Sequence, residues 1–332
     1  MDWFEKLTGF RERDYEGTRS RLEVDGGHLS SKVNGQSYAT GNLETPSLKE
    51  VRERAQAALR DVAGTLNVSC VAGDVREMHR APANCNALFQ VASQFNLLEM
   101  ADPDLTPEDG VSRYGNDHTQ GPACALAAGA ATIYRNYFAN VDGHSGQTRQ
   151  TQIDCLRDVG VALGNEGEVL WTMRNGYALC TDTGLAEIDR RLGASSDAQI
   201  DELRDMLRIG LHWDVEVTDA PNPRPRVSQA FCSALPVSHS FIPAHRWSAF
   251  ARLVLEGAYE ATLWAAVLNA ERSSSNVVFL TRLGGGAFGN DHAWIQAALG
   301  RSLDIVKDIG LDVRLVSYGA SPVELVRLAE QY

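Results

Sequence analysis

The stretch 277–299, VVFLTRLGGGAFGNDHAWIQAAL, constrains the fold of this chain more than any other. It opens with a short run of β-branched and apolar residues, Val277–Leu280, which is typical of a buried strand. Four glycines follow at positions 284–286 and 289, and apolar residues at helical spacing begin at Trp294. A strand, a glycine loop and a helix start in this order direct backbone N–H groups and the positive end of a helix dipole at one place. The loop is therefore predicted to bind a phosphate or a diphosphate.

Two common phosphate-binding folds do not match this loop. Its glycine spacing is neither GxGxxG opening a helix nor GxxxxGK[ST], and no Lys follows the glycines. The spacing thus argues against a dinucleotide-binding fold and against P-loop nucleotide hydrolysis. The alternative is a glycine-rich turn that only connects two elements, although four glycines in six residues exceed what a simple turn needs.

Strand-like and helix-like segments alternate along the chain, which predicts an α/β fold with a mixed, partly parallel sheet flanked by helices. An Asn175-Gly176 pair between two apolar runs predicts a β-hairpin with a type I′ turn. The other strands are expected at 66–75, 87–92, 212–217, 277–280 and 313–318, and the helices at 45–62, 121–137, 184–192, 197–211, 247–269, 291–309 and from Ser321, read as an N-cap, onward.

Ligands of such sheets bind at the carboxyl ends of the strands. This rule places three loops around one crevice: Gly73-Asp74, Gln94–Glu99 and Gly284–Asp291. The convergence of the three loops predicts one pocket.

The composition restricts the partners and the compartment. A net charge of −12 and a sequence pI of about 5.1 argue against nucleic-acid binding and favour small-molecule or protein partners. The six cysteines are scattered without a CxxC pair, so a reducing, cytoplasmic location is expected. No signal peptide, membrane span, metal site or cofactor is predicted, since no apolar run approaches eighteen residues and no HxH or HExxH spacing occurs.

Three short motifs resemble those of the macrodomain family of ADP-ribose-binding α/β proteins. Ala72-Gly73-Asp74-Val75 matches the strand end whose Asp accepts the adenine amino group, and Ala92–Asn96 resembles the segment whose last Asn holds the distal ribose. Gly286-Ala287-Phe288-Gly289 matches the loop around the diphosphate. The resemblance implies ADP-ribose binding by Asp74, Val75, Gln94, Phe95, Asn96, Gly284, Gly285, Gly286, Ala287, Phe288, Gly289 and Asn290.

The chain also departs from the usual macrodomain pattern. Leu97-Leu98-Glu99 replaces the glycine run after Asn96, and a large segment at about 138–276 separates the first two motifs from the third. This pattern is similar to a divergent branch that includes a bacterial hydrolase removing ADP-ribose from an arginine of ubiquitin. The resemblance implies an N-terminal extension, 1–45, and a single macrodomain-like domain, 46–332, with an insertion at about 138–276.

Release of ADP-ribose from a side chain is displacement at an anomeric carbon, which needs carboxylates for acid and base catalysis. Glu99, Asp117 and Asp291 are the predicted catalytic residues, since they lie in the loop after Asn96 and in the glycine loop. Helix capping competes with catalysis as the role of Asp117 and Asp291.

The leading hypothesis is an ADP-ribosyl hydrolase acting on a modified protein, with ADP-ribose and ubiquitin as its implied partners. A non-catalytic ADP-ribose reader is the first alternative. The second is a cysteine hydrolase that uses Cys124 and His118, although a buried thiol is the commoner fate of such a cysteine.

Overall fold

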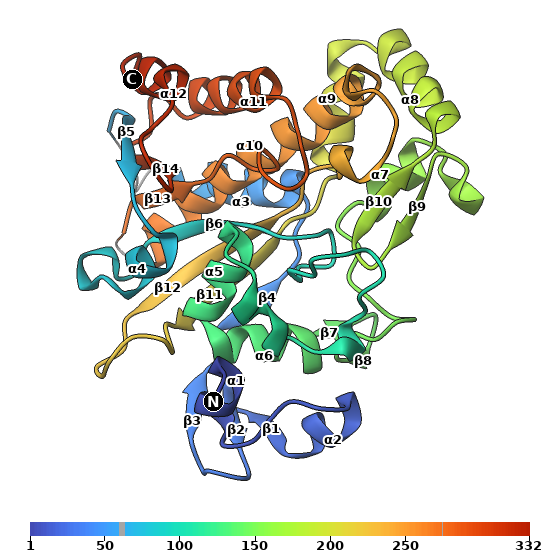
Figure 1. Cartoon of the computed structure of the whole chain (residues 1–332). Helices are drawn as coiled ribbons and strands as arrows, with labels where there is room; N and C mark the ends of the chain where they lie inside the picture. The colour runs from blue at the N-terminus through green and yellow to red at the C-terminus, as the bar shows by residue number, and fades with distance from the viewer. Residues whose placement is uncertain (60–63, 274) are drawn as a thin grey trace.

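A computed structural model describes residues 1–59, 64–273 and 275–332. One mixed sheet of seven strands, in the order β4-β11-β12-β6-β13-β14-β5, runs through the molecule (Figure 1). Neighbouring strands from β12 to β5 are parallel, and β11 is antiparallel to both β12 and β4. The strands are β4 (Asn42–Glu44), β5 (Asn67–Ala72), β6 (Leu88–Ala92), β11 (Gly210–Glu216), β12 (Arg226–Cys232), β13 (Val277–Leu280) and β14 (Asp312–Ser317).

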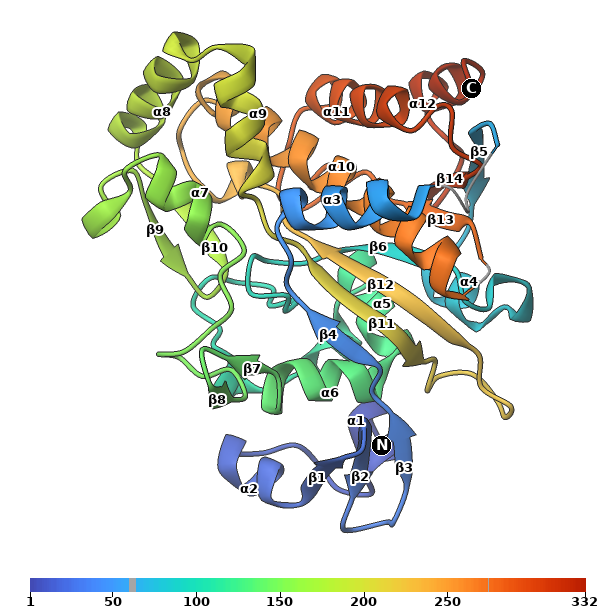
Figure 2. The same cartoon turned by 180° about the vertical axis from the view of Figure 1, so that it is seen from behind.

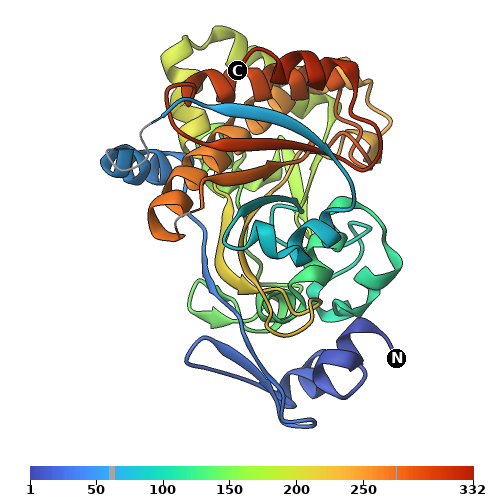
Figure 3. The ribbon, with the colours of Figure 1, turned by 90° about the vertical axis from the view of Figure 1, so that its left-hand side faces the viewer.

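Helices cover both faces of this sheet, which is the predicted α/β class. Figure 3 shows the orange and red helices α10 and α11 on one face and the cyan and green helices α4, α5 and α6 on the other. In the rear view, α3 lies beside α10 (Figure 2). The helices are α3 (Leu48–Ala58), α4 (Val75–Arg80), α5 (Gln120–Ala127), α6 (Gly129–Tyr137), α7 (Arg157–Ala162), α8 (Asp182–Ala194), α9 (Asp197–Asp205), α10 (Ser248–Ser273), α11 (His292–Ile305) and α12 (Val323–Ala329).

The core lies between the sheet and these helices. All but the last residue of β6 are buried, because its neighbours on both sides are strands and helices cover both faces. Phe89 of β6 stacks on Phe279 of β13 with ring centroids 4.4 Å apart, and the His79 ring of α4 stacks on the other side of Phe89. This aromatic stack fixes α4 against the middle of the sheet.

The first forty residues form a small layer beneath α6 (Figure 1). It contains α1 (Trp3–Thr8), α2 (Tyr15–Ser20) and the antiparallel strands β1 (Leu22–Asp25), β2 (His28–Ser31) and β3 (Ser37–Ala39). Two further ribbons, β7 (Asn140–Val141) with β8 (His144–Ser145) and β9 (Trp171–Arg174) with β10 (Tyr177–Cys180), stand outside the main sheet.

Several local predictions are confirmed. A helix begins directly after the expected start at 45–47: α3 starts at Leu48, and Ser47 caps it in a capping box with Glu50. The β9–β10 hairpin turns at Asn175 and Gly176, whose φ angles of 47° and 81° are those of a type I′ turn. The predicted end of the first long helix, at Val62, lies outside the described residues.

Other predictions are wrong. The segment 121–137 is two helices, because the backbone leaves helical geometry at Ala128. The strand expected at 66–75 ends at Ala72, and Asp74 begins the unpredicted helix α4. The N-cap of α12 is Pro322 rather than Ser321.

The division into an extension, a domain and an insertion stays a prediction. Within the segment 138–276 lie β11 and β12, which are inner strands of the main sheet, and α10, which packs on it. This segment therefore contributes to the core as well as to the surroundings of the site.

Candidate active site

The carboxyl ends of β5, β6, β13 and β14 lie at one edge of the sheet, since these strands are parallel. Their loops enclose two cavities. The Glu99 cavity, about 180 Å³, is lined by residues that include Gln94, Glu99, Gly284 and Phe288. The Asp74 cavity, about 520 Å³, is lined by residues that include Asp74.

The two cavities are parts of one trough. Six residues line both of them: Asp117, Thr119, Gln120, Thr281, Arg282 and Gly286. The structure thus brings the three predicted loops together, with the glycine loop at the junction. A molecule with two bulky ends and a narrow middle matches this shape.

The glycine loop, residues 284–289, offers free donors at the junction. Within the described part of the chain, the N–H groups of Gly286, Ala287 and Phe288 donate no hydrogen bond. A Cβ at Gly286 would meet no atom within 4 Å, so a ligand can approach this exposed backbone closely. Three adjacent free donors form an anion-binding concavity.

Two features fix the conformation of the glycine loop: a close approach that only glycine permits at position 284, and a hydrogen bond from the Asn290 side chain. Gly284 has φ +71°, and a Cβ there would lie 2.4 Å from Cβ of Ala234. The buried Asn290 side chain donates to the Leu235 carbonyl at 2.8 Å. Three predicted binding residues, Asn290, Gly285 and Gly289, line neither cavity. They therefore stabilise the loop rather than form the wall of the trough.

Arg282 supplies a positive charge at the junction. It is partly buried and lines both cavities, and among the described residues it makes no ion pair. One guanidinium nitrogen contacts the His292 ring at the start of α11. The guanidinium and the three free N–H groups together can neutralise a diphosphate.

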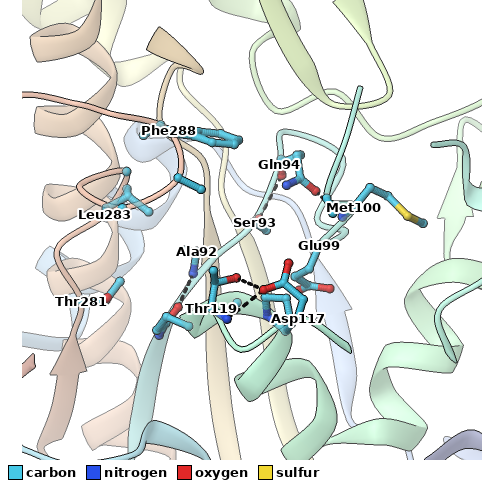
Figure 4. Close-up of a pocket in the computed structure, with 18 of the residues that line it drawn as sticks. Ala92, Ser93, Gln94, Glu99, Met100, Asp117, Thr119, Thr281, Leu283 and Phe288 are labelled. Atoms are coloured by element: carbon cyan, nitrogen blue, oxygen red, sulfur yellow. Dashed lines mark hydrogen bonds between the residues drawn. The ribbon is translucent and has the colours of Figure 1, made fainter. Parts of the chain in front are cut away.

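Glu99 is the buried carboxylate of the smaller cavity (Figure 4). Only 3% of the residue is exposed. Oε1 accepts a hydrogen bond from the guanidinium of the fully buried Arg135 at 3.3 Å, while Oε2 has no partner among the described residues. Burial raises the pKa of Glu99 to about 7, although Arg135 opposes this shift. A carboxylate with one tethered oxygen, one free oxygen and a near-neutral pKa suits acid–base catalysis.

Tight packing holds Glu99 in place. A Cβ on Gly121 of α5 would lie 2.0 Å from the Ala92 carbonyl and 3.1 Å from Cγ of Glu99, so only glycine lets α5 approach so closely. The Glu99 backbone N–H donates to the Tyr114 hydroxyl at 3.0 Å. Gln120, at the start of α5, accepts from the Ala92 N–H at 2.8 Å and extends the end of β6.

The other two predicted catalytic carboxylates lie in different places. Asp117 lines both cavities, and its Oδ1 accepts from the N–H and the hydroxyl of Thr119. Asp291 lines neither cavity: it is exposed and caps α11 by accepting from the Ala293 N–H at 2.7 Å. The geometry favours the helix-capping alternative for Asp291, and its catalytic role stays a prediction.

Asp74 and Val75 lie in the wall of the larger cavity, as the resemblance implies. Asp74 also caps α4, since Oδ1 accepts from the Arg76 N–H at 2.8 Å. Tyr318, directly after β14, lines the same cavity with 84% of its surface exposed. An exposed ring beside a carboxylate is suited to a nucleobase.

Phe95 and Asn96, predicted to contact ribose, line neither cavity. Both are buried, and the chain turns at Leu97, with φ 63°, before it lines the trough again from Glu99. The Asn96 amide donates to the Gln152 side chain at 2.8 Å, and its ribose-binding role stays a prediction. Gln94 does line the Glu99 cavity, and its Oε1 accepts from the Met100 N–H at 2.7 Å.

Sequence reasoning missed several lining residues. Tyr177 and His239 surround Phe288, with ring centroids 5.2–5.4 Å apart, at the wall of the Glu99 cavity. Arg282 and Tyr318 were missed as well. Tyr318 is the last residue of the strand predicted at 313–318, and Arg282 lies two positions after the strand predicted at 277–280, so the strand-end rule itself was the available signal.

The cysteine alternative finds no support in the geometry. Cys124 is fully buried and lines neither cavity, whereas His118 lines the Asp74 cavity. Burial raises the pKa of the Cys124 thiol well above its usual value, which disfavours the thiolate nucleophile.

Two negative findings concern the described residues only. No group of three or more His, Cys, Asp or Glu side chains is arranged to hold a metal ion. No helix in these ranges is long and apolar enough to cross a membrane.

No protein-family model and no curated protein matches the sequence. Comparison of structures finds poly(ADP-ribose) glycohydrolases. The one from Deinococcus radiodurans, solved with ADP-ribose, is 13% identical, with a TM-score of 0.44 over 87% of this chain and 93% of that chain. The one from Thermomonospora curvata, bound to the inhibitor ADP-HPD, is 14% identical, with a TM-score of 0.43 over 92% and 94%. Likenesses of this size establish no activity, and the divergent macrodomain branch stays a prediction.

Proposed function

We propose that this protein is an ADP-ribosyl hydrolase, which binds ADP-ribose in the trough and releases it from a modified protein side chain. One observation carries the proposal. Glu99, whose buried carboxylate keeps one oxygen without a partner among the described residues, lines the same trough that presents three free backbone donors at 286–288. Binding alone does not need a buried carboxylate with an unpartnered oxygen, which costs folding free energy.

The shape of the trough suggests how ADP-ribose lies. The adenine would occupy the Asp74 cavity, with its amino group donating to Asp74 and its ring against Tyr318. The diphosphate would lie at the junction, where the glycine loop and Arg282 are. The distal ribose would then enter the Glu99 cavity.

The proposed reaction breaks the bond between the anomeric carbon of the distal ribose and the acceptor atom of the side chain. The bonding electron pair leaves with the acceptor atom, and the sugar passes through an oxocarbenium-like state. A water oxygen then bonds to the anomeric carbon while Glu99 accepts one proton from that water. This proton balances the one taken up by the acceptor atom, so the products are free ADP-ribose and the unmodified side chain.

Asp117 is the second carboxylate of this proposal. Thr119 holds its Oδ1, and among the described residues its Oδ2 makes no hydrogen bond. We assign Asp117 to the hydroxyls of the ribose, which it would orient toward Glu99. Arginine of ubiquitin, implied by the resemblance, is the first acceptor to test.

The proposal is tested by incubating the protein with arginine-linked and carboxylate-linked ADP-ribosylated proteins, including ADP-ribosylated ubiquitin. Free ADP-ribose is measured by mass spectrometry. We expect release by the wild type, loss in Glu99→Gln, and retention in Asp291→Asn, because Asn preserves the helix cap. Tight binding of ADP-ribose without any release by the wild type would instead identify a reader.

A further inference from the structure

A third cavity lies beside the trough and has no part in the proposed reaction. The Arg149 cavity, about 550 Å³, is lined by Asp104, Thr106, Arg149, Gln150, Gln152, Ile153, Asp154, Arg157, Met173, Arg174, Asn175 and Gly176. Most of these residues come from the segment 138–276, the extra material relative to the usual macrodomain pattern.

One thin wall separates this cavity from the Glu99 cavity. Tyr177 lines the Glu99 cavity, while its chain neighbour Gly176 lines the Arg149 cavity. Likewise, the exposed Ala101 lines the Glu99 cavity, and the exposed Asp104, three positions later, lines the Arg149 cavity. Because three residues span at most about 11 Å, two or three residues of an extended substrate can cross this wall.

Hydrogen bonds make the wall rigid. The Tyr177 hydroxyl donates to the Met100 carbonyl at 2.6 Å, and the Asn175 amide donates to the Pro103 carbonyl at 2.7 Å. The Gln152 amide donates to Asn175 at 2.9 Å. The two cavities are therefore held at a fixed separation.

The charge of the cavity is unusual for this protein. Three guanidinium groups and two carboxylates line it, although the chain as a whole carries −12. Arg174 pairs with Asp104, and Arg157 pairs with Asp142 at 3.1 Å. The guanidinium of Arg149 makes no ion pair with any residue that the structure describes, so it is available to an anionic ligand.

The residues that line the cavity favour the acidic side chains of a peptide over a nucleotide as the anionic ligand. Among the residues that the structure describes, no aromatic side chain lines the cavity, so a nucleobase would have no ring to stack on. Acidic side chains of a peptide need only guanidinium and amide donors, which the cavity supplies.

We propose that the Arg149 cavity binds acidic residues of the ADP-ribosylated protein, two to four positions from the modified side chain. This inference rests on the proposed function for the location of the modified residue. It makes the cavity a subsite that selects acceptor proteins by the charge of their sequence.

The test measures binding, so it does not depend on hydrolysis. Fluorescent peptides carry one arginine-linked ADP-ribose and either Glu or Ser three positions away, and the host protein is Glu99→Gln. Anisotropy should show about two- to fivefold tighter binding of the Glu peptide, the size of an exposed ion pair, and the preference should shrink in high salt.

Arg149→Glu in the same host should abolish the preference, while its affinity for free ADP-ribose stays unchanged. The matched control is Arg252→Glu, an exposed arginine of α10 that lines none of the three cavities and should keep the preference. Equal binding of both peptides by the host, or a preference that survives Arg149→Glu, would overturn the subsite. If the wild type releases no ADP-ribose but the host still binds the Glu peptide more tightly, the proposed hydrolase activity is refuted and the subsite is not.

Discussion

Replacing Glu99 by Gln separates catalysis from stability at this site. The two side chains have nearly the same shape, and the Gln carbonyl oxygen can still accept the hydrogen bond from Arg135. The substitution removes the ionisable group, so hydrolysis should fall by about 10²- to 10⁴-fold, the usual contribution of a general base. ADP-ribose affinity should stay within an order of magnitude, because the free N–H groups of the glycine loop are untouched.

The same substitution should change the pH dependence of stability in a predictable direction. Burial raises the pKa of Glu99 in the folded protein to about 7, whereas in the unfolded chain it is about 4.3. Between these values the folded state holds a proton that the unfolded state has released. The free energy of unfolding of the wild type therefore falls as pH rises, by up to about 1.4 kcal/mol per pH unit. Gln does not titrate, so the free energy of unfolding of the variant lacks this pH dependence.

Urea unfolding of both proteins at pH 5 and pH 8 measures this difference. Relative to the wild type, the Gln variant should gain on the order of 3 kcal/mol between the two pH values. Glu23→Gln, at an exposed position in β1, is the control and should show no such change. The wild-type kcat/KM should also rise with pH through about 7. A stability difference that is equal at both pH values would refute the buried, titrating carboxylate.

Asp74→Ala should weaken ADP-ribose binding by about 1–3 kcal/mol in calorimetry, because the adenine amino group loses its acceptor, while ribose 5-phosphate binding should not change. Asn290→Ala removes the bond to the Leu235 carbonyl, so we expect a loss of about 1–3 kcal/mol in urea unfolding together with weaker ADP-ribose binding. Arg135→Met should lower stability by about 3–5 kcal/mol and, since Arg135 opposes the raised pKa of Glu99, should move the rise of kcat/KM to higher pH. An unchanged pH profile in that variant would contradict the pairing.

The glycine loop was predictable because its signals are local. A β-branched run, four glycines and a helical pattern occupy adjacent positions, and none depends on a distant residue. The same holds for the Asn175-Gly176 turn. The edge at which the loops meet followed from parallel strands alone.

Strand β12 was missed because its polar residues conceal a buried strand. Ser228 and Gln229 interrupt the otherwise apolar segment 227–232, yet both are buried. The Gln229 amide donates to the Cys124 carbonyl at 3.1 Å, a partner more than a hundred positions away. The residue pattern around 226–232 does not indicate that the Cys124 carbonyl will accept this hydrogen bond.

The placement of Phe95 and Asn96 outside the two cavities has a similar cause. Which side chains after β6 face the trough depends on the left-handed turn at Leu97 and on the hairpin that packs against it. The Phe95 N–H donates to the Gly176 carbonyl at 3.0 Å, so a turn eighty positions later fixes this segment. Sequence spacing from the strand end cannot include such a contact.

The pairing of Glu99 with Arg135 meets two opposing requirements of a buried catalytic carboxylate. With both oxygens bound to the guanidinium, the carboxylate would be ionised but a poor base, since its lone pairs would be occupied. With no partner, burial would keep it protonated at neutral pH. The single contact at 3.3 Å through Oε1 leaves Oε2 free while still favouring ionisation. Because Arg135 is itself fixed by the Leu97 carbonyl at 3.1 Å, the turn that follows Asn96 is also the one that positions this base.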